Sequence, residues 1–327
     1  MLTTSIIIIL LAILLIALVI LLGPRPRLKP HPPASNVPND LSMIDLKAWL
    51  EEAESAIPRL TPGAEANLKW ADPDKPQRTE LCLLYIHGFS ATPRETAPLT
   101  ERLAARFGAN CVHARLAGHG IQPSMTSTAE GWLQSVIDAW DIAQRIGDRV
   151  VVVGTSTGAT LSVWLAHQPF TADRIHAAIF LAPNFNVRST FSSLLTWPWA
   201  PYWVSLLVGK HYEWEPQNEM EAKYWTTRYP VHALIEMQKT VDWSRNVDYA
   251  NFQIPLVTMY MRNDPTIDPH AAVAIHEAWG SEQKQLIPVS LDGDEAQHVF
   301  VGDITAPHRV DWCTERLELF LQNLENS

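Results

Sequence analysis

The chain has little cysteine, which argues against two classes of small protein. Only three cysteines occur among its 327 residues, at Cys82, Cys111 and Cys313, and no two of them form a C-x-x-C pair. An odd and widely spaced set neither builds a disulfide framework nor supplies the thiolates of a structural zinc site. We expect three buried thiols.

Basic residues are also in short supply. The chain has 25 lysines and arginines against 35 aspartates and glutamates, a formal net charge of −10. A surface of that charge repels a polyanion, so nucleic acid is a poor candidate partner. Internal repeats are absent from the sequence, and apart from the first 22 residues its composition is that of an ordered soluble domain.

A long apolar run is present at the N-terminus. Every residue from Ile6 to Leu22 is Ile, Leu, Ala or Val. As a helix rising ~1.5 Å per residue, this run reaches ~25 Å, close to the ~30 Å of a hydrocarbon core. No basic residue precedes the run, and Gly23-Pro24-Arg25 is a poor cleavage site. We therefore favour an uncleaved transmembrane anchor at residues 1–24 over a cleaved signal peptide.

The residues that follow the anchor predict its orientation. Three basic residues come after the apolar run and none before it: Arg25, Arg27 and Lys29. The positive-inside bias then predicts a single-pass membrane protein with its remaining chain on the cytoplasmic side, the periplasmic or extracellular side being the alternative. Six prolines between residues 24 and 40 forbid a helix and favour an extended tether. This tether and a helix at 42–56 make up an N-terminal segment of residues 25–75.

The body alternates between two kinds of segment. Short apolar runs occur at 81–86, 111–116, 149–153, 175–182, 255–261 and 284–289. Helical patterns lie between or after them, at 94–107, 129–147, 159–167, 269–280 and 308–323. This alternation predicts an α/β fold with a mostly parallel sheet covered on both faces.

The alternation stops between Pro183 and Asn246. No strand is evident there, and six tryptophans occur, at positions 197, 199, 203, 214, 225 and 243. We predict a helical cap at 184–246, inserted between two core segments, 76–183 and 247–327. The indole rings either enclose an apolar acyl chain, meet a membrane interface, or simply pack the cap onto the core.

A nucleophile motif lies at the end of the run 149–153. Gly154-Thr155-Ser156-Thr157-Gly158 matches the G-x-S-x-G elbow and is followed by a helical pattern, the strand–turn–helix context that this motif requires. The flanking glycines allow a tight turn in which the serine adopts a strained conformation with its hydroxyl exposed. Ser156 is therefore the candidate nucleophile.

A second turn supplies a candidate oxyanion donor. His87-Gly88-Phe89-Ser90 closes the run 81–86 and precedes a helical pattern. From this position a backbone amide can reach an oxyanion, so we predict that the N–H groups of Phe89 and Thr157 form the oxyanion hole. We expect His87 to shape the turn rather than to transfer protons.

The acid and the base are expected late in the chain. The run 255–261 leads into a loop with two aspartates, Asp264 and Asp268. A carboxylate directly after the strand suits the acid, which favours Asp264, whereas Asp268 before a proline is typical of a helix N-cap. His298 lies between the run 284–289 and the last helix, and the order Ser, Asp, His fits this type of sheet.

Together these segments resemble the α/β-hydrolase family, and within it the bacterial carboxylesterases and monoacylglycerol lipases. The resemblance covers roughly residues 79–323 and is carried by the elbow, the Asp264 and His298 surroundings, Trp132, His87-Gly88-Phe89-Ser90-Ala91-Thr92-Pro93, and Arg115-Leu116-Ala117-Gly118-His119-Gly120. It implies Ser156 as nucleophile, His298 as general base, Asp264 as its partner, and the Phe89 and Thr157 amides as oxyanion hole. The elbow departs from that branch, which usually has Leu or Phe before the serine and Met-Gly-Gly after it.

These observations predict a membrane-anchored serine hydrolase that cleaves carboxylic esters through an acyl-enzyme and needs no metal or cofactor. Because of the anchor, we expect small lipophilic esters such as monoacylglycerols or lysophospholipids. A thioesterase or amidase would use the same three residues, and a non-catalytic, membrane-tethered binding protein is the other alternative. Epoxide hydrolases and haloalkane dehalogenases of this fold need a carboxylate where the chain has Ser156.

Overall fold

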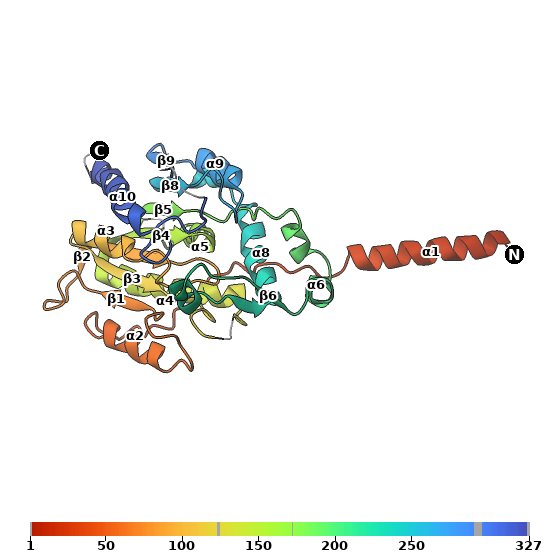
Figure 1. Ribbon diagram of the computed structural model, residues 1–327, viewed down its shortest axis with the longest axis horizontal. Coiled ribbons are helices and arrows are strands. Elements are labelled where there is room, and N and C mark those ends of the chain that lie inside the picture. The colour runs from red at the N-terminus through yellow and green to blue at the C-terminus, as the bar shows by residue number, and fades with distance from the viewer. Residues whose placement is uncertain (1, 123–124, 172, 291–295, 326–327) are drawn as a thin grey trace.

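The computed structural model describes residues 2–122, 125–171, 173–290 and 296–325. An α/β body occupies most of the chain, and a straight N-terminal helix, α1 (Leu2–Leu21), projects from one end of it (Figure 1). The C-terminus lies at the opposite end of the body.

The main sheet has seven strands within the described residues, in the order β1-β3-β2-β4-β5-β8-β9. Their bounds are β1 (Asn67–Lys69), β2 (Thr79–Ile86), β3 (Asn110–Ala114), β4 (Gly147–Thr155), β5 (Ile175–Leu181), β8 (Leu256–Tyr260) and β9 (Lys284–Pro288). Only β1 runs antiparallel to its neighbour. The central strand β4 contains Val150–Val153, all buried, because β-branched side chains suit a strand covered on both faces.

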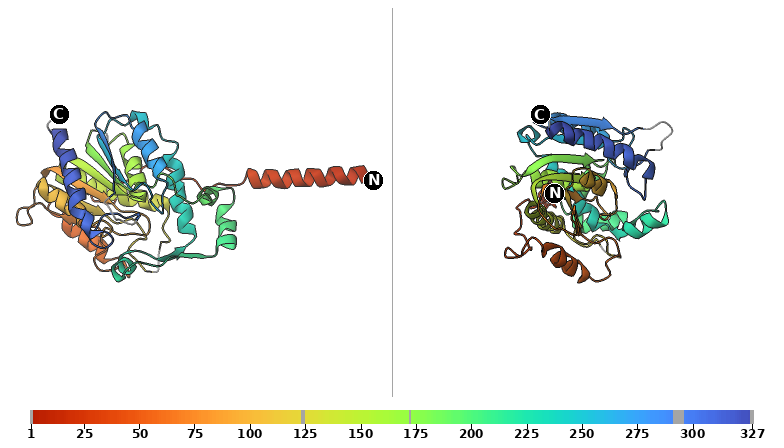
Figure 2. Two further views of the ribbon diagram at one scale, coloured as in Figure 1. Left: turned by 45° about the horizontal axis from the view of Figure 1, so that its top comes forward. Right: turned by 90° about the vertical axis from the view of Figure 1, so that its left-hand side faces the viewer.

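Helices cover both faces of the sheet (Figure 2). On one face lie α4 (Ala129–Ile146), α5 (Thr157–Ala166) and α9 (Pro269–Ala278), around a core that includes four buried tryptophans, Trp132, Trp140, Trp164 and Trp279. On the other face α3 (Leu99–Arg106) packs beside α10 (Val310–Glu325). The short turns η2 (Tyr249–Asn251) and η3 (Pro307–Arg309) precede β8 and α10.

The predicted α/β architecture is confirmed. All six apolar runs form strands of the main sheet, and the five helical patterns correspond to α3, α4, α5, α9 and α10. The expected helix at 42–56 is α2 (Leu46–Ser55). Strand β1 was not predicted, because its three residues are too few to show an alternation of apolar and polar side chains.

The segment predicted as a helical cap is mostly helical, but it also contains two strands, so the expectation of no strand there is wrong. Its elements are η1 (Ser192–Thr196), α6 (Ala200–Val208), β6 (His211–Glu213), α7 (Glu219–Tyr224), β7 (Arg228–Pro230) and α8 (His232–Ser244). The strands β6 and β7 pair antiparallel, with the rings of Tyr212 and Tyr229 stacked across them. Each strand has three residues, too few for a periodic pattern.

The N-terminal helix does not meet the prediction of a transmembrane anchor at residues 1–24. Over the part of the chain whose side chains are described, which in α1 begins at Ser5, no helix combines the length and the apolarity needed to cross a membrane.

The proline-rich segment is extended, as predicted, but it is not a free tether. Residues 24–40, here called the proline strip, lie along the body with Leu28 and Val37 buried. Trp164 Nε1 donates a hydrogen bond to the Pro30 carbonyl oxygen at 2.9 Å. On α4, five side chains spaced three or four residues apart form hydrogen bonds with the strip: Glu130, Gln134, Asp138, Asp141 and Arg145. The strip is therefore part of the folded body.

Candidate active site

The turn that carries Ser156 joins β4 to α5 and is sterically constrained. Ser156 has φ 53° and ψ −119°, a conformation that residues other than glycine rarely adopt. A Cβ atom on Gly158 would lie 2.0 Å from the Ile86 carbonyl oxygen, and one on Gly154 would lie 2.5 Å from Ser162 Oγ. Only glycine at these two positions lets β4, α5 and β2 approach so closely, and this approach holds the serine in its strained conformation.

A continuous chain of hydrogen bonds runs from Ser156 to a buried carboxylate. Ser156 Oγ lies 2.8 Å from His298 Nε2, and His298 Nδ1 lies 2.8 Å from Asp264 Oδ2. Asp264 is fully buried, and its other carboxylate oxygen accepts hydrogen bonds from the backbone N–H groups of Thr266 and Ile267. The carboxylate is thus fixed by its own loop, with one oxygen directed at the imidazole.

The second aspartate of that loop has a different role. Asp268 is the N-cap of α9 and accepts a hydrogen bond from the backbone N–H of His270 at 3.0 Å. It also accepts one from Asn186 Nδ2 at 3.2 Å. The sequence favoured Asp264 over Asp268 as the acid, and in the structure Asp264 lies against His298 while Asp268 begins a helix.

The two amides expected to bind an oxyanion adjoin Ser156. Thr157 is the first residue of α5, so its N–H has no acceptor within the helix. The loop that carries Phe89 passes so close that a Cβ on Gly88 would lie 3.0 Å from Ser156 Cβ. Neither amide has a hydrogen-bond partner among the residues described here. Two unpaired donors beside a serine hydroxyl are the arrangement that stabilises developing negative charge.

His87 holds this loop in place. It is fully buried, its Nδ1 is 2.8 Å from the Gly88 carbonyl oxygen, and its Nε2 accepts the Leu116 N–H at 3.0 Å. Burial lowers the pKa of His87 well below 6.5, and the nearby His119 lowers it further. A neutral ring that donates through Nδ1 and accepts through Nε2 satisfies both contacts, consistent with the structural role expected for this residue.

Glu95 belongs to the site and was missed by sequence reasoning. Its Oε2 accepts hydrogen bonds from the Gly88 N–H at 2.7 Å and from the Tyr85 hydroxyl at 2.9 Å. Burial raises the pKa of Glu95 to about 7, although these hydrogen bonds and the charge of His298 oppose the rise. Residue 95 falls within the helical pattern 94–107, in which an acidic side chain is expected on the exposed face. In the structure the helix begins only at Leu99, so nothing in the sequence indicated that Glu95 is buried.

The electrostatics of His298 follow from its two acidic neighbours. Burial lowers the pKa of His298, but the charge and hydrogen bond of Asp264, together with the charge of Glu95, outweigh it and leave this pKa above 6.5. The imidazolium form of His298 is therefore stabilised.

The cap meets the loop that carries Phe89. The Phe89 ring lies edge-on to Trp132 of α4 and to Tyr229 of β7, with centroids 5.9 and 5.2 Å apart. The Thr226 N–H donates to the Ser90 carbonyl oxygen at 2.7 Å. Aromatic side chains from the core and the cap therefore surround one side of the site, and the cap restrains the loop beside the serine.

The cysteines lie away from this chemistry. All three are free and buried, as expected. Across the described ranges no three His, Cys, Asp or Glu side chains gather in a way that could hold a metal ion.

Comparison with known proteins places the chain in context. A model described as "Alpha/beta hydrolase family" matches residues 83–308. A thermostable monoacylglycerol lipase of Bacillus sp. strain H-257 is 31% identical over 105 residues, which cover 31% of this chain and 42% of that protein. The aligned segment therefore spans less than half of the lipase.

Solved structures share the fold. A structure from work on the metagenome-derived lipolytic enzymes LipS and LipT has a TM-score of 0.61 and 22% identity, covering 81% of this chain and 99% of that one. A monoacylglycerol lipase from Paleococcus ferrophilus gives 0.59 and 14%, covering 80% and 99%. A soluble variant of the Saccharomyces cerevisiae monoglyceride lipase, with a substrate analog, gives 0.58 and 16%, covering 80% and 92%.

Proposed function

Because the chain belongs to the alpha/beta hydrolase family, we propose that it is a serine hydrolase that cleaves carboxylic esters through an acyl-enzyme on Ser156. One observation carries this proposal: the hydrogen-bond chain from Ser156 through His298 to Asp264, next to two backbone amides that have no partner among the described residues.

In the proposed mechanism His298 is the proton carrier. As Ser156 Oγ attacks the ester carbonyl, His298 Nε2 accepts its proton, and Asp264 stabilises the imidazolium. The N–H groups of Phe89 and Thr157 stabilise the oxyanion, and each such donor typically lowers the barrier by ~3 kcal/mol. The imidazolium then protonates the leaving alkoxide. Water attacks the acyl-enzyme with the same base, which releases the carboxylic acid and restores the serine.

We propose lipophilic esters, such as monoacylglycerols or lysophospholipids, as substrates. The similarity to the Bacillus monoacylglycerol lipase supports this class. So does the aromatic surround of the Phe89 loop, where Tyr229 of the cap clusters with buried Met125. Apolar side chains of this kind suit an acyl chain better than a sugar or a peptide.

We also propose that α1 attaches the protein to a membrane. Its large side chains from Ile6 to Leu21 are apolar on every side and 48 to 64% exposed, which leaves lipid as the medium that would bury them. The basic residues after α1 favour attachment with the body on the cytoplasmic side.

The cap adjoins the end of α1. The Trp199 backbone N–H donates to the Pro24 carbonyl oxygen, and its indole Nε1 donates to the Val19 carbonyl oxygen at 3.1 Å. On α6, which Trp199 precedes, Tyr202, Leu206 and Leu207 are 69 to 82% exposed. In the proposed arrangement α6 rests on the same lipid surface to which α1 attaches.

The test uses the full chain in detergent micelles and a series of p-nitrophenyl esters with acyl chains from C2 to C16. We expect hydrolysis with a maximum at medium or long chains, and a loss of several orders of magnitude in Ser156→Ala. A folded wild-type protein that hydrolyses none of these esters, and whose Ser156 is not labelled by a fluorophosphonate, would contradict the proposal. Labelling without ester turnover would shift it to thioesters or amides.

A further inference from the structure

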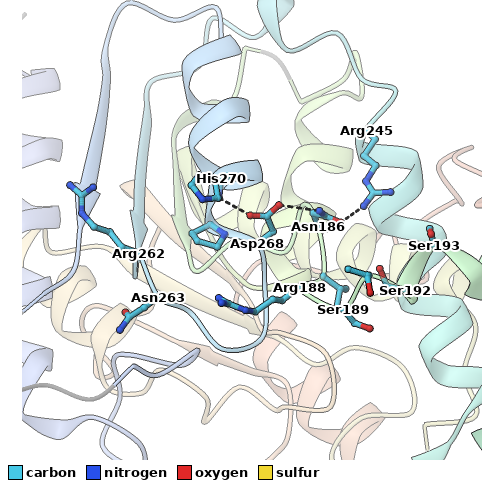
Figure 3. Close-up of a pocket in the computed structure, with 13 residues that line it drawn as sticks. Asn186, Arg188, Ser189, Ser192, Ser193, Arg245, Arg262, Asn263, Asp268 and His270 are labelled. Carbon is cyan, nitrogen blue, oxygen red and sulfur yellow. Dashed lines mark hydrogen bonds between the residues drawn. The ribbon is translucent and has the colours of Figure 1, made fainter.

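A polar pocket lies beside the loop that carries Asp264 but takes no part in the proposed chemistry. Its volume is about 640 Å³, and its walls come from the segment after β5, from η1, from the residue after α8, and from the loop before α9 with the start of that helix (Figure 3). Three guanidinium groups and the hydroxyl groups of three serines and one threonine line it: Arg188, Arg245, Arg262, Ser189, Thr190, Ser192 and Ser193. We call it the arginine pocket.

The pocket carries excess positive charge. Asp268 is the one carboxylate among its lining residues, and it is already engaged by the His270 N–H and by Asn186 Nδ2. Arg245 has an ion-pair partner outside the pocket, Asp242, whereas Arg188 and Arg262 have no carboxylate partner among the described residues. Such an imbalance in a concave site attracts an anion.

Two of the arginines have guanidinium donors without a partner among the described residues. Arg188 donates through Nη1 to the Asp264 carbonyl oxygen at 2.8 Å, and it has no carboxylate partner in the described part of the chain. Arg262 makes neither a hydrogen bond nor an ion pair with any described residue. Arg245 reaches Asn186 and lies 3.4 Å from Asp242. Figure 3 shows Arg245 and Arg262 on opposite sides of the pocket with Arg188 between them.

The donor set suits a tetrahedral oxyanion. A guanidinium offers several N–H groups in one plane and binds phosphate through two of them, which a lysine ammonium cannot do. Serine hydroxyls add single donors around the same group. We propose that the arginine pocket binds a phosphate group, with Arg188 and Arg262 as its principal ligands.

The position of the pocket makes a lipid headgroup one source of that phosphate. One wall is η1, which packs against α6, and α6 adjoins the end of α1. Figure 1 shows α6 at the end of the body from which α1 projects. This step rests on the proposed membrane attachment. A soluble phosphate ester is the other source, and both present the same phosphate chemistry.

Occupation of the pocket would also bear on the catalytic acid. The backbone N–H of Arg188 donates a hydrogen bond to the Thr266 carbonyl oxygen at 3.0 Å, and Val187 forms an antiparallel β-bridge with Ile267. These contacts connect the pocket wall to the segment whose amides hold the Asp264 carboxylate. A bound phosphate is expected to stabilise this segment and so raise the melting temperature.

The first experiment measures the melting temperature and calorimetric binding of inorganic phosphate by the full chain in detergent, against chloride at equal ionic strength. We expect phosphate to raise the melting temperature, and Arg188→Gln and Arg262→Gln each to weaken binding at least tenfold. Arg262→Gln has no described contact to lose, so its effect is not one of misfolding. Arg59→Gln is the matched control, since Arg59 is exposed and lies between α2 and β1. Ser156→Ala should bind phosphate normally, which separates this proposal from the hydrolase proposal.

The second experiment identifies the source of the phosphate. Flotation with phosphatidylcholine vesicles is compared with flotation when phosphatidic acid is included, and glycerol 3-phosphate is titrated separately. An arginine-dependent preference for phosphatidic acid identifies a lipid headgroup, and tight arginine-dependent binding of glycerol 3-phosphate identifies a soluble ester. Equal stabilisation by phosphate, acetate and chloride, or phosphate binding unchanged in both arginine variants, would overturn the proposal.

Discussion

Two regions of the molecule differ in packing. The residues around Ser156 are closely packed, whereas helix α6 of the cap leaves its largest side chains exposed. Around the serine, Asp264 is fully buried and every residue of α5 is buried. On α6, Leu206 and Leu207 are 82 and 77% exposed, and α1 beyond them is exposed on all sides. Proton transfer needs fixed distances, which dense packing provides, while contact with an external apolar phase needs apolar surface left uncovered.

The largest expected effect lies in the packed region. Asp264→Asn should lower kcat on a short p-nitrophenyl ester by about 10⁴-fold, because an amide cannot stabilise the imidazolium and favours the wrong tautomer. Steady-state kinetics at pH 8 provide the measurement. Asp268→Asn is the matched control: it retains an N-capping side chain and should keep near-normal turnover. Equal losses in the two variants would refute the assignment of the acid.

Packing around the elbow should also appear in stability. Gly158→Ala places a Cβ 2.0 Å from a backbone oxygen of Ile86, and we expect a loss of about 3 kcal/mol in the free energy of unfolding. Gly108→Ala meets no atom within 4 Å and carries only the cost of its φ of +55°, about 1 kcal/mol. Chemical denaturation of the two variants tests the difference. A Gly158→Ala protein as stable as Gly108→Ala would mean that the elbow is not tightly constrained.

A smaller effect is expected at Glu95. Since the base must be unprotonated to accept the serine proton, kcat/KM should rise with pH through the pKa of His298, which lies above 6.5 in the wild type. Glu95→Gln removes a negative charge near His298, so the pKa of His298 should fall and the rise in kcat/KM should move to lower pH. The plateau value of kcat/KM should fall a few-fold, because the Gly88 N–H loses a charged acceptor. Glu52→Gln on the exposed face of α2 should leave the pH profile unchanged. A profile unaffected by Glu95→Gln would show that Glu95 acts on packing alone.

The exposed region should show the smallest effect on catalysis. Leu206→Ser combined with Leu207→Ser should change turnover of a short soluble ester by no more than about twofold, because neither side chain packs against the site. The same variant, in a chain lacking residues 1–23, should float less with vesicles than the shortened parent. Leu319→Ser, on the exposed side of α10, is the control. A large loss of soluble-ester turnover would show that α6 shapes the site itself.

The closely packed region is also the part of the structure that could be predicted from the sequence. The core strands were predictable because burial on two faces demands continuous apolar runs such as Val150–Val153. The elbow was predictable because its two glycines stand where the close approach of strand and helix leaves no room for a Cβ atom, at a fixed spacing on either side of the serine. Asp264 and His298 were proposed from their places after β8 and β9, and the preference for Asp264 over Asp268 rested on the position of Asp264 directly after the strand.

What remained unpredicted depends on contacts between distant segments. Glu95 becomes part of the site because the chain stays irregular from residue 94 until α3 begins at Leu99, which its helical pattern did not reveal. The arginine pocket assembles side chains from three separate segments, near residues 188, 245 and 262, with no local motif. The strands β6 and β7 exist because they pair with each other, since three residues have no period of their own.

The proline strip has a consequence for the entropy of folding. Proline restricts φ, so a segment with six prolines has fewer unfolded conformations to lose than an ordinary chain of its length. A few well-placed contacts, such as the Trp164 indole to the Pro30 carbonyl, are then enough to order it. An ordered strip fixes the point and the direction from which α1 leaves the body. The angle between α1 and the body is therefore set by the contacts of the strip, whereas a flexible linker would allow many angles.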